Sequence, residues 1–291
     1  MSLQSKLKSI QNSIKKDPLL ARERFTEEFI EDILPELSED DLESEQVRYI
    51  YDHLFQGVLP TCSPKFLNTE IVKYRVKAEC VDKYVKDYCF LKYLACGDYG
   101  CVFQVCEGKE EKEGKNCKYV IKITHVTRKE EIKNAEQEIS MTKIASDINI
   151  GPKFIATWSC KGEYLLWDKW VDATLFFIVM DKMDITLKEY IYSAPVDFLR
   201  NVDKIKAQVK TRIESLHAAG ITHNDLHLRN IMLNFEDIGA KDLTITDVKF
   251  IDFGAAILDA SEHKIERDLD LLEKIEHQRV IEEKEWGTKK K

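Results

Sequence analysis

The feature that most constrains the fold is a polar segment, His223-Asn224-Asp225-Leu226-His227-Leu228-Arg229-Asn230, which two apolar runs separate from Asp252-Phe253-Gly254. The runs at 231–233 and 248–251 predict two short paired strands joined by a loop. Such a hairpin returns the chain to its starting end, so we expect Asn230 and Asp252 to lie close together. Amide and carboxylate oxygens are hard ligands of the kind that Mg²⁺ prefers. The segment therefore predicts a magnesium site at one end of a hairpin.

Composition indicates the broad class of protein. Hydrophobic residues make up 44% of the 291 residues and charged residues 33%, which predicts a globular chain with a sizeable core. The formal net charge of −8 disfavours non-specific binding of nucleic acid. Apolar runs have strand length, and the first residues lack an apolar signal core. We therefore expect no membrane association and a cytoplasmic or nuclear location, in a cell or, for a viral protein, in its host.

Three stretches of the chain differ in pattern. Residues 1–88 predict helices, because helix-start signals occur at Asp17-Pro18, Ser38 to Asp41, and Ser63-Pro64. Residues 89–183 contain five short strand candidates with one helix after the third. Residues 184–291 predict helices around the hairpin. The pattern indicates an α+β fold with an antiparallel sheet lobe, a helical lobe and an N-terminal helical extension.

Eight cysteines lie between Cys62 and Cys160, and none forms a C-x-x-C pair. They are expected to be reduced, mostly buried thiols in strands, as in a reducing compartment. The alternative is a metal site built from Cys96, Cys101 and Cys106, although zinc sites usually use tighter pairs.

Two further motifs precede the polar segment. The turn from Ala95 to Val102 carries Gly97 and Gly100, where a missing Cβ lets backbone amides approach a phosphate. Lys122 ends an apolar run, where an unpaired charge is costly. It needs a carboxylate partner, for which Glu138 is our choice and Glu136 the alternative.

Together these motifs resemble the protein-kinase superfamily over about residues 89–275, with the patterns G-x-G-x-x-G-x-V, V-A-I-K, H-R-D-L-x-x-x-N and D-F-G. The resemblance implies a bilobal fold, the use of ATP with Mg²⁺, and transfer of a phosphoryl group. We expect the acceptor to be a protein, which the sequence does not identify. It further implies a role for each matching residue. These are the loop over the nucleotide (Ala95, Gly97, Gly100, Val102), the phosphate lysine and its partner (Lys122, Glu138), the adenine-binding hinge (Met180, Asp181, Met183), the catalytic base (Asp225) and the metal ligands (Asn230, Asp252).

Three departures narrow the resemblance. Asn224 replaces the arginine that receives an activating phosphate in many kinases, so such control is not expected. His227 replaces a lysine that contacts the γ-phosphate. After Gly254 the chain lacks an A-P-E motif and a long activation segment.

This short end is similar to that of the compact atypical serine/threonine kinases of the Bud32 and RIO kind. There Asp270, or alternatively Asp268, would support the catalytic loop from a helix predicted within 260–285. The N-terminal helices are expected to brace the shortened lobe or to bind a partner. The alternatives are a pseudokinase acting as an ATP-binding scaffold, because Ala95 replaces the first glycine, and a small-molecule kinase.

Overall fold

The computed structural model describes residues 2–63, 66–81, 85, 87–97, 100–108, 117–167, 169–236, 244–259 and 261–286. They form two compact units. One unit combines Met1–Glu131 with Thr157–Val179, and the other combines Ile132–Ala156 with Met180–Lys291. The expected borders at residues 88 and 183 stay predictions.

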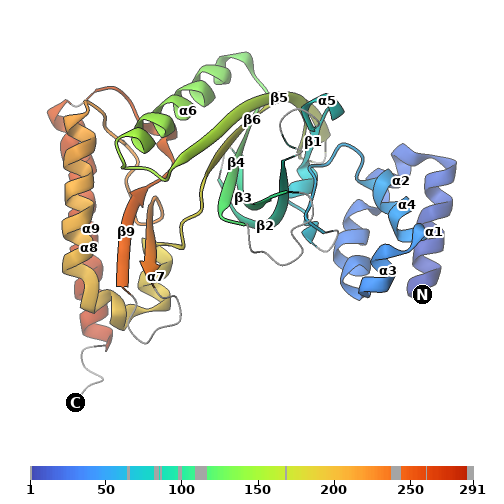
Figure 1. Ribbon diagram of the computed structural model, residues 1–291, viewed down its shortest axis with the longest axis horizontal. Helices are drawn as coiled ribbons and strands as arrows, with labels where there is room; N and C mark the ends of the chain where they lie inside the picture. The colour runs from blue at the N-terminus through green and yellow to red at the C-terminus, as the bar shows by residue number, and fades with distance from the viewer. Residues whose placement is uncertain are drawn as a thin grey trace. The chain divides into compact units, whose positions relative to one another are not determined.

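The first unit begins with a group of helices (Figure 1), namely α1 (Leu3–Lys16), α2 (Pro18–Glu28), the π-helix η1 (Phe29–Ile33), the 3-10 helix η2 (Leu34–Glu36), α3 (Glu39–Glu43) and α4 (Glu45–Leu54). Two of the predicted start signals are confirmed. The Asp17 carboxylate accepts hydrogen bonds from the first turn of α2, and Ser38 with Asp41 forms a capping box. The single helix expected between Ser38 and Gly57 is divided, because Ser44 ends α3 and caps α4.

The helix expected from Ser63 to Tyr88 is wrong. The described part of this stretch instead contains the 3-10 helix η4 (Ile71–Lys73), strand β1 (Tyr74–Val76) and the short α5 (Ala78–Cys80). The burial of Tyr74 and Val76, with Arg75 between them more exposed, is the alternation of a strand. β1 pairs with β5, so tertiary pairing overrides the local start signal.

The sheet of the first unit is antiparallel where its pairing is described, and it has one strand more than the five predicted. Its order is β1-β5-β6-β4-β3-β2. The strands after β1 are β2 (Tyr88–Gly97), β3 (Gly100–Glu107), β4 (Tyr119–Val126), β5 (Phe154–Leu166) and β6 (Lys169–Asp181). One face packs a cluster of rings in which Phe103 contacts Tyr74, Phe90 and Tyr93 edge-on. The resulting sheet is strongly curled (Figure 1).

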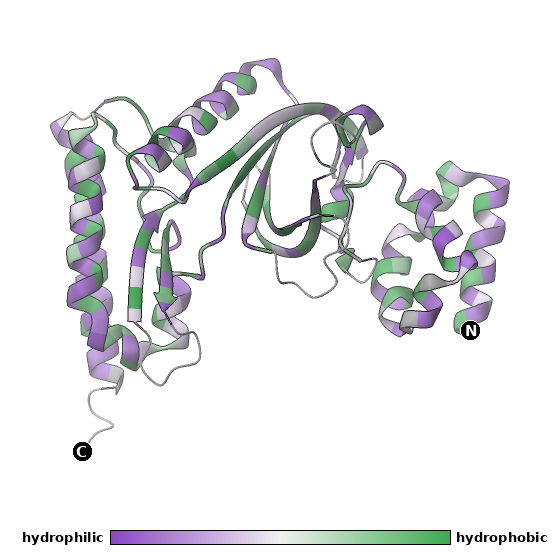
Figure 2. Cartoon of the chain, in the orientation of Figure 1, coloured by the Kyte–Doolittle hydropathy of each residue, from purple (hydrophilic) through white to green (hydrophobic). Residues whose placement is uncertain are grey.

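The second unit surrounds the predicted hairpin with helices. The 3-10 helix η6 (Lys129–Glu131) ends the first stretch of the first unit. The elements of the second unit are α6 (Ile132–Asp147), β7 (Ile185–Thr186), α7 (Leu187–Ser193), α8 (Pro195–Ala218), β8 (Ile231–Glu236), β9 (Thr244–Phe250), η7 (Phe253–Ala255) and α9 (Glu262–Trp286). α8 packs against α9, and both helices alternate between hydrophobic and hydrophilic residues along their length (Figure 2). The predicted C-terminal helix is confirmed as α9, while Ala260 and the final residues 287–291 lie outside the described part. Among the described residues, no helix is both long and apolar enough to cross a membrane.

All eight cysteines are paired, so the expectation of reduced thiols is wrong. The disulfides join Cys62 to Cys89, Cys80 to Cys160, Cys96 to Cys101, and Cys106 to Cys117. The spacing of cysteines along the sequence did not indicate these pairs, because each depends on which strands become neighbours. The pairing also removes the argument from cysteines for a reducing compartment.

Candidate active site

The glycine-rich turn joins β2 to β3 in the first unit. Gly97 pairs with Gly100 at its base, and Asp98 and Tyr99 between them lie outside the described residues. Farther from the turn, Ala95 pairs with Val102 and Val102 pairs with Lys122 of β4. Directly paired residues share one face of a sheet. The pairing therefore places Ala95, Val102 and Lys122 in one row across three strands.

The two glycines of this turn have different surroundings. A Cβ on Gly100 would lie 2.0 Å from the carbonyl oxygen of Ile123, so the neighbouring strand β4 excludes any side chain there. A Cβ on Gly97 would meet nothing within 4 Å among the described residues. The close approach of β3 to β4 therefore explains why residue 100 is a glycine. Only at Gly97 does the missing side chain leave open space for a ligand, as the sequence predicted for both glycines.

Glu138 and Lys122 belong to different units, and their pairing stays a prediction. Glu138 lies on α6 and is buried, while the alternative Glu136 is exposed. A Cβ on Gly254 would lie 3.7 Å from Oε2 of Glu138. The carboxylate of Glu138 therefore faces the Asp252-Phe253-Gly254 segment within the second unit.

The predicted hinge follows β6. Met180 and Met183 are buried, and Asp181 between them is half-buried. The backbone N–H of Asp181 donates to the carbonyl of Lys153 at 3.0 Å. Both methionines are therefore fixed by packing, and the role of this segment as an adenine-binding hinge stays a prediction.

The polar segment forms a closed loop ahead of β8. The amide Nδ2 of Asn230 donates to the backbone carbonyl of Asp225 at 3.0 Å and lies 3.4 Å from its Oδ2. The Asp225 carboxylate is exposed, and Nε2 of His227 lies 3.8 Å from its Oδ2. Asn230 is itself buried, so its amide is fixed and its Oδ1 remains as the oxygen for a ligand. The loop thus presents one exposed carboxylate beside a fixed amide.

The predicted hairpin brings Asp252 to this loop. Ile231 pairs with Phe250, and the N–H of Ile251 donates to the carbonyl of Asn230 at 3.0 Å. Asp252 is the next residue, it is exposed, and its backbone φ of 64° is left-handed. This confirms that β8 and β9 are paired strands joining the two motifs, so Asn230 and Asp252 stand at the same end of the hairpin.

A buried carboxylate anchors the loop from below. Asp268 of α9 is fully buried and accepts hydrogen bonds from the backbone N–H of His223 (2.8 Å) and of Asn224 (3.0 Å). Its third partner is Nε2 of His217, at 3.0 Å. Asp270 is exposed, so our choice of Asp270 is wrong and the alternative, Asp268, occupies the supporting position. Asp268 shares a helical face with the buried Leu271 and Ile275, a spacing that the choice of Asp270 did not take into account.

His223 is fully buried in this core. Its Nε2 donates to the carbonyl of Ile251 at 3.0 Å, and its Nδ1 has no hydrogen-bond partner among the described residues. Burial lowers the pKa of His223, although the carboxylates of Asp268, Asp252 and Asp225 all act in the opposite direction. Desolvation prevails because a second proton, on Nδ1, would be a buried charge without an acceptor.

Asn224 has a structural role that the sequence did not predict. Its φ is 64°, in the left-handed region that asparagine tolerates better than most residues. The side-chain Nδ2 donates to the carbonyl of Ala255 at 3.1 Å. Asn224 therefore ties the loop to the residues that follow Gly254, where the resemblance had indicated only the loss of an arginine.

Comparison with known proteins agrees with these motifs. The family model described as "Protein kinase domain" matches residues 88–269, which is more than half of the chain. No curated protein matches the chain significantly. The match covers strands β2 to β6 of the curled sheet, the loop at Asp225 and Asn230, the hairpin, and Asp252. The chain therefore belongs to the protein kinase domain family and has its mixed α+β fold, which identifies it as a phosphotransferase of the kinase type.

Proposed function

We propose that this chain is an ATP- and Mg²⁺-dependent serine/threonine protein kinase of a compact, atypical kind. The observation that carries the proposal is the arrangement in the second unit. There the exposed carboxylate of Asp225, the fixed amide of Asn230 and the exposed Asp252 occupy one end of the β8–β9 hairpin. The required groups are present together, which favours an active enzyme over a binding scaffold.

Asn230 and Asp252 would hold the magnesium ion. Both offer hard oxygen atoms, and the donation of Nδ2 of Asn230 to Asp225 leaves Oδ1 for a ligand. When bound, Mg²⁺ neutralises charge on the phosphates during transfer. The donor set therefore fits the ion that the family uses.

Asp225 would act as the base. An exposed carboxylate on a rigid loop can accept the proton of a serine or threonine hydroxyl as that oxygen attacks phosphorus. Asn230 fixes the backbone of Asp225, while Asp268 fixes the two residues before it. His227, beside Asp225, would donate a hydrogen bond to a phosphate oxygen in place of the usual lysine.

The first unit would bind the rest of the nucleotide. Lys122 would contact the α- and β-phosphates, with Glu138 as its partner, and Val102 in the same row would pack on the adenine. Gly97 would leave room for a phosphate near the turn. Ala95 stands in this row in place of the first glycine, and its small side chain would leave room for the nucleotide.

The test is transfer of label from γ-labelled ATP with Mg²⁺ to the chain itself and to general protein substrates. Asp225→Asn, Asp252→Asn and Lys122→Ala are each expected to lower transfer at least 100-fold, as loss of general-base or electrostatic stabilisation does. Asp225→Asn should retain nucleotide binding, measured as a thermal shift with Mg·ATP. Glu136→Gln, on the exposed face of α6, is the matched control and should transfer normally. Equal transfer by all variants would refute the roles, and label on tyrosine alone would refute the acceptor class.

A further inference from the structure

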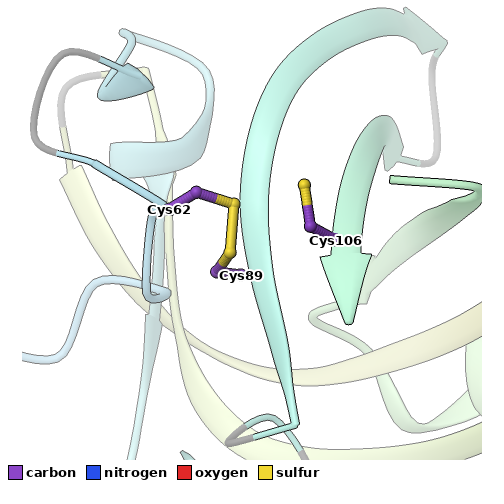
Figure 3. Close-up of side chains that lie close together, drawn as sticks. All are labelled: Cys62, Cys89 and Cys106. Atoms are coloured by element: carbon purple, nitrogen blue, oxygen red, sulfur yellow. A yellow bond between two sulfur atoms is a disulfide. The ribbon is translucent and has the colours of Figure 1, made fainter. Parts of the chain in front are cut away.

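Four of the eight cysteines, none of them assigned to the proposed kinase site, form one cluster in the first unit. Cys89, Cys106 and Cys117 form a core of their own, with Cys62 and Leu91 packed against it. The sulfur atoms of Cys62, Cys89 and Cys106 all lie within 4.8 Å of one another, and Cys117 is bonded to Cys106. Figure 3 shows the Cys62–Cys89 disulfide with the Cys106 side chain beside it.

The cluster gathers four separate backbone segments. Cys62 follows a short bridge to β2, in which its N–H donates to the carbonyl of Phe90 at 3.0 Å. Cys89 and Cys106 are direct partners across β2 and β3. Cys117 stands just before β4, where the side chain of Gln104 donates to its carbonyl at 2.8 Å. Backbone and side-chain hydrogen bonds therefore hold all four positions in place independently of the bonds between sulfur atoms.

We propose that these four cysteines, when reduced, form a structural zinc site. A tetrahedral zinc ion with four thiolate ligands at about 2.3 Å needs sulfur atoms about 3.8 Å apart. Three of the sulfur atoms already lie within 4.8 Å of one another, and Cys117, bonded to Cys106, would supply the fourth. Cys106 is fully buried, Cys89 is 2% exposed and Cys117 is 7% exposed, so three of the four ligands are shielded from water as in structural sites. Cys62 is half-buried and provides the route of entry.

The exchange between the two forms is balanced. Each of the two disulfides takes two electrons and two protons from a dithiol reductant, which becomes a disulfide itself. The four thiols then bind Zn²⁺ as thiolates and release four protons. In the oxidised form, Cys62–Cys89 and Cys106–Cys117 are two separate cross-links, whereas zinc would join all four segments at one point.

A second group of potential ligands is less suited to a metal. Glu70 lies near Cys96 and Cys101, but this group offers only three ligands in total, and Cys96 is exposed. The carboxylate of Glu70 also already pairs with Lys73 at 2.8 Å. The four-cysteine cluster is therefore the site that the proposal concerns.

The experiment measures zinc bound by the full chain in its reduced and oxidised forms. The protein is reduced with a dithiol under anaerobic conditions, incubated with zinc chloride, desalted and analysed by elemental mass spectrometry. We expect one zinc per chain after reduction and none when intact mass shows four disulfides. Cobalt added in place of zinc should give the strong visible absorption of tetrahedral sulfur coordination. A reduced chain that binds no zinc would overturn the proposal.

Variants locate the site. Cys62→Ser removes the half-buried ligand, and Cys106→Ser/Cys117→Ser removes two; both should weaken zinc binding at least tenfold in competition with a chromophoric chelator. Cys80→Ser/Cys160→Ser is the matched control, because the reduced parent also lacks that cross-link, and it should bind zinc within twofold of the parent.

Protection from alkylation provides a readout on the parent that does not depend on how a variant folds. Zinc should slow alkylation of the four cluster cysteines and of no others. Zinc binding unchanged in both ligand variants, or protection of Cys96 and Cys101 in place of the cluster, would refute the assignment.

Discussion

The contact most open to a quantitative test is the one between Asp268 and the loop that carries Asp225. The carboxylate accepts two backbone N–H groups and one imidazole N–H, and it is fully buried. A hydrogen bond to a charged group contributes about 1.5–3 kcal/mol, and such bonds are not additive. Removing one partner from a buried charged arrangement costs about 3–5 kcal/mol. We therefore expect Asp268→Ala to destabilise the loop by about 3–5 kcal/mol.

Asp268→Asn is the more informative change, because it keeps the volume and one acceptor oxygen. Its –NH₂ group would face an N–H that formerly donated, so one bond is replaced by a repulsive contact. We expect a cost of about 2–3 kcal/mol from one lost charge-assisted bond and one unsatisfied N–H. The same change at the exposed Asp270, two residues along the helix, should cost less than about 0.5 kcal/mol and is the control.

Amide hydrogen exchange is the appropriate assay, because a chain with two compact units need not unfold in one step. Every 1.4 kcal/mol lost corresponds to about tenfold faster exchange when the loop opens locally. The peptide containing His223 and Asn224 should exchange about 30- to 140-fold faster in Asp268→Asn, while α6 should be unaffected. Exchange at the parental rate, or an equal effect in Asp270→Asn, would refute the anchoring role of Asp268.

Three further predictions concern the fold around the site. Gly100→Ala should lower stability by about 2 kcal/mol or more, because its Cβ would meet the Ile123 carbonyl oxygen, whereas Gly97→Ala should leave chemical unfolding unchanged. As the pH is lowered past about 6.5, the free energy of unfolding should decrease by up to about 1.4 kcal/mol per pH unit. The reason is that His223 takes up a proton in the unfolded chain, whereas burial lowers its pKa in the folded chain. His223→Gln should remove this part of the pH dependence in urea titrations at pH 7.5 and 5.5. Breaking the Cys80–Cys160 disulfide should lower the free energy of unfolding by up to about 4–5 kcal/mol in urea titration, against about 2 kcal/mol for Cys96–Cys101. The difference arises because a cross-link removes more entropy from the unfolded chain when it closes a longer loop, and the bonded residues are 80 and 5 positions apart. Equal losses would contradict this argument.

Local signals in the sequence predicted the elements that depend on neighbouring residues. The Asp17 cap and the Ser38–Asp41 capping box each involve residues within three positions, and both form as expected. The predicted strand at 231–233 lies within β8, and the predicted strand at 248–251 overlaps the end of β9, which stops at Phe250. Each of these depends on contacts whose partners are visible in one short window of sequence.

The errors share a different cause, which is partners distant in the chain. β1 occupies a stretch with a helix-start signal, because Tyr74 and Val76 are buried when Arg75 pairs with Glu163 of β5. Cys80 and Cys160 meet across the same part of the fold, and no spacing rule relates residues so far apart. The choice between Asp268 and Asp270 was also decided by a nonlocal contact, with the loop at His223.

The contacts of Asn224 bear on our expectation that the catalytic loop is not controlled by phosphorylation. An arginine there would supply a charge that orders the following segment only when a phosphate is added. Asn224 instead makes a neutral hydrogen bond to Ala255, and its own N–H is held by Asp268. The order of the loop is thus set by groups that are always present. Asn224→Arg should therefore weaken transfer without making it dependent on phosphorylation, because arginine is less suited to a φ of 64° and no longer donates the amide hydrogen bond to Ala255.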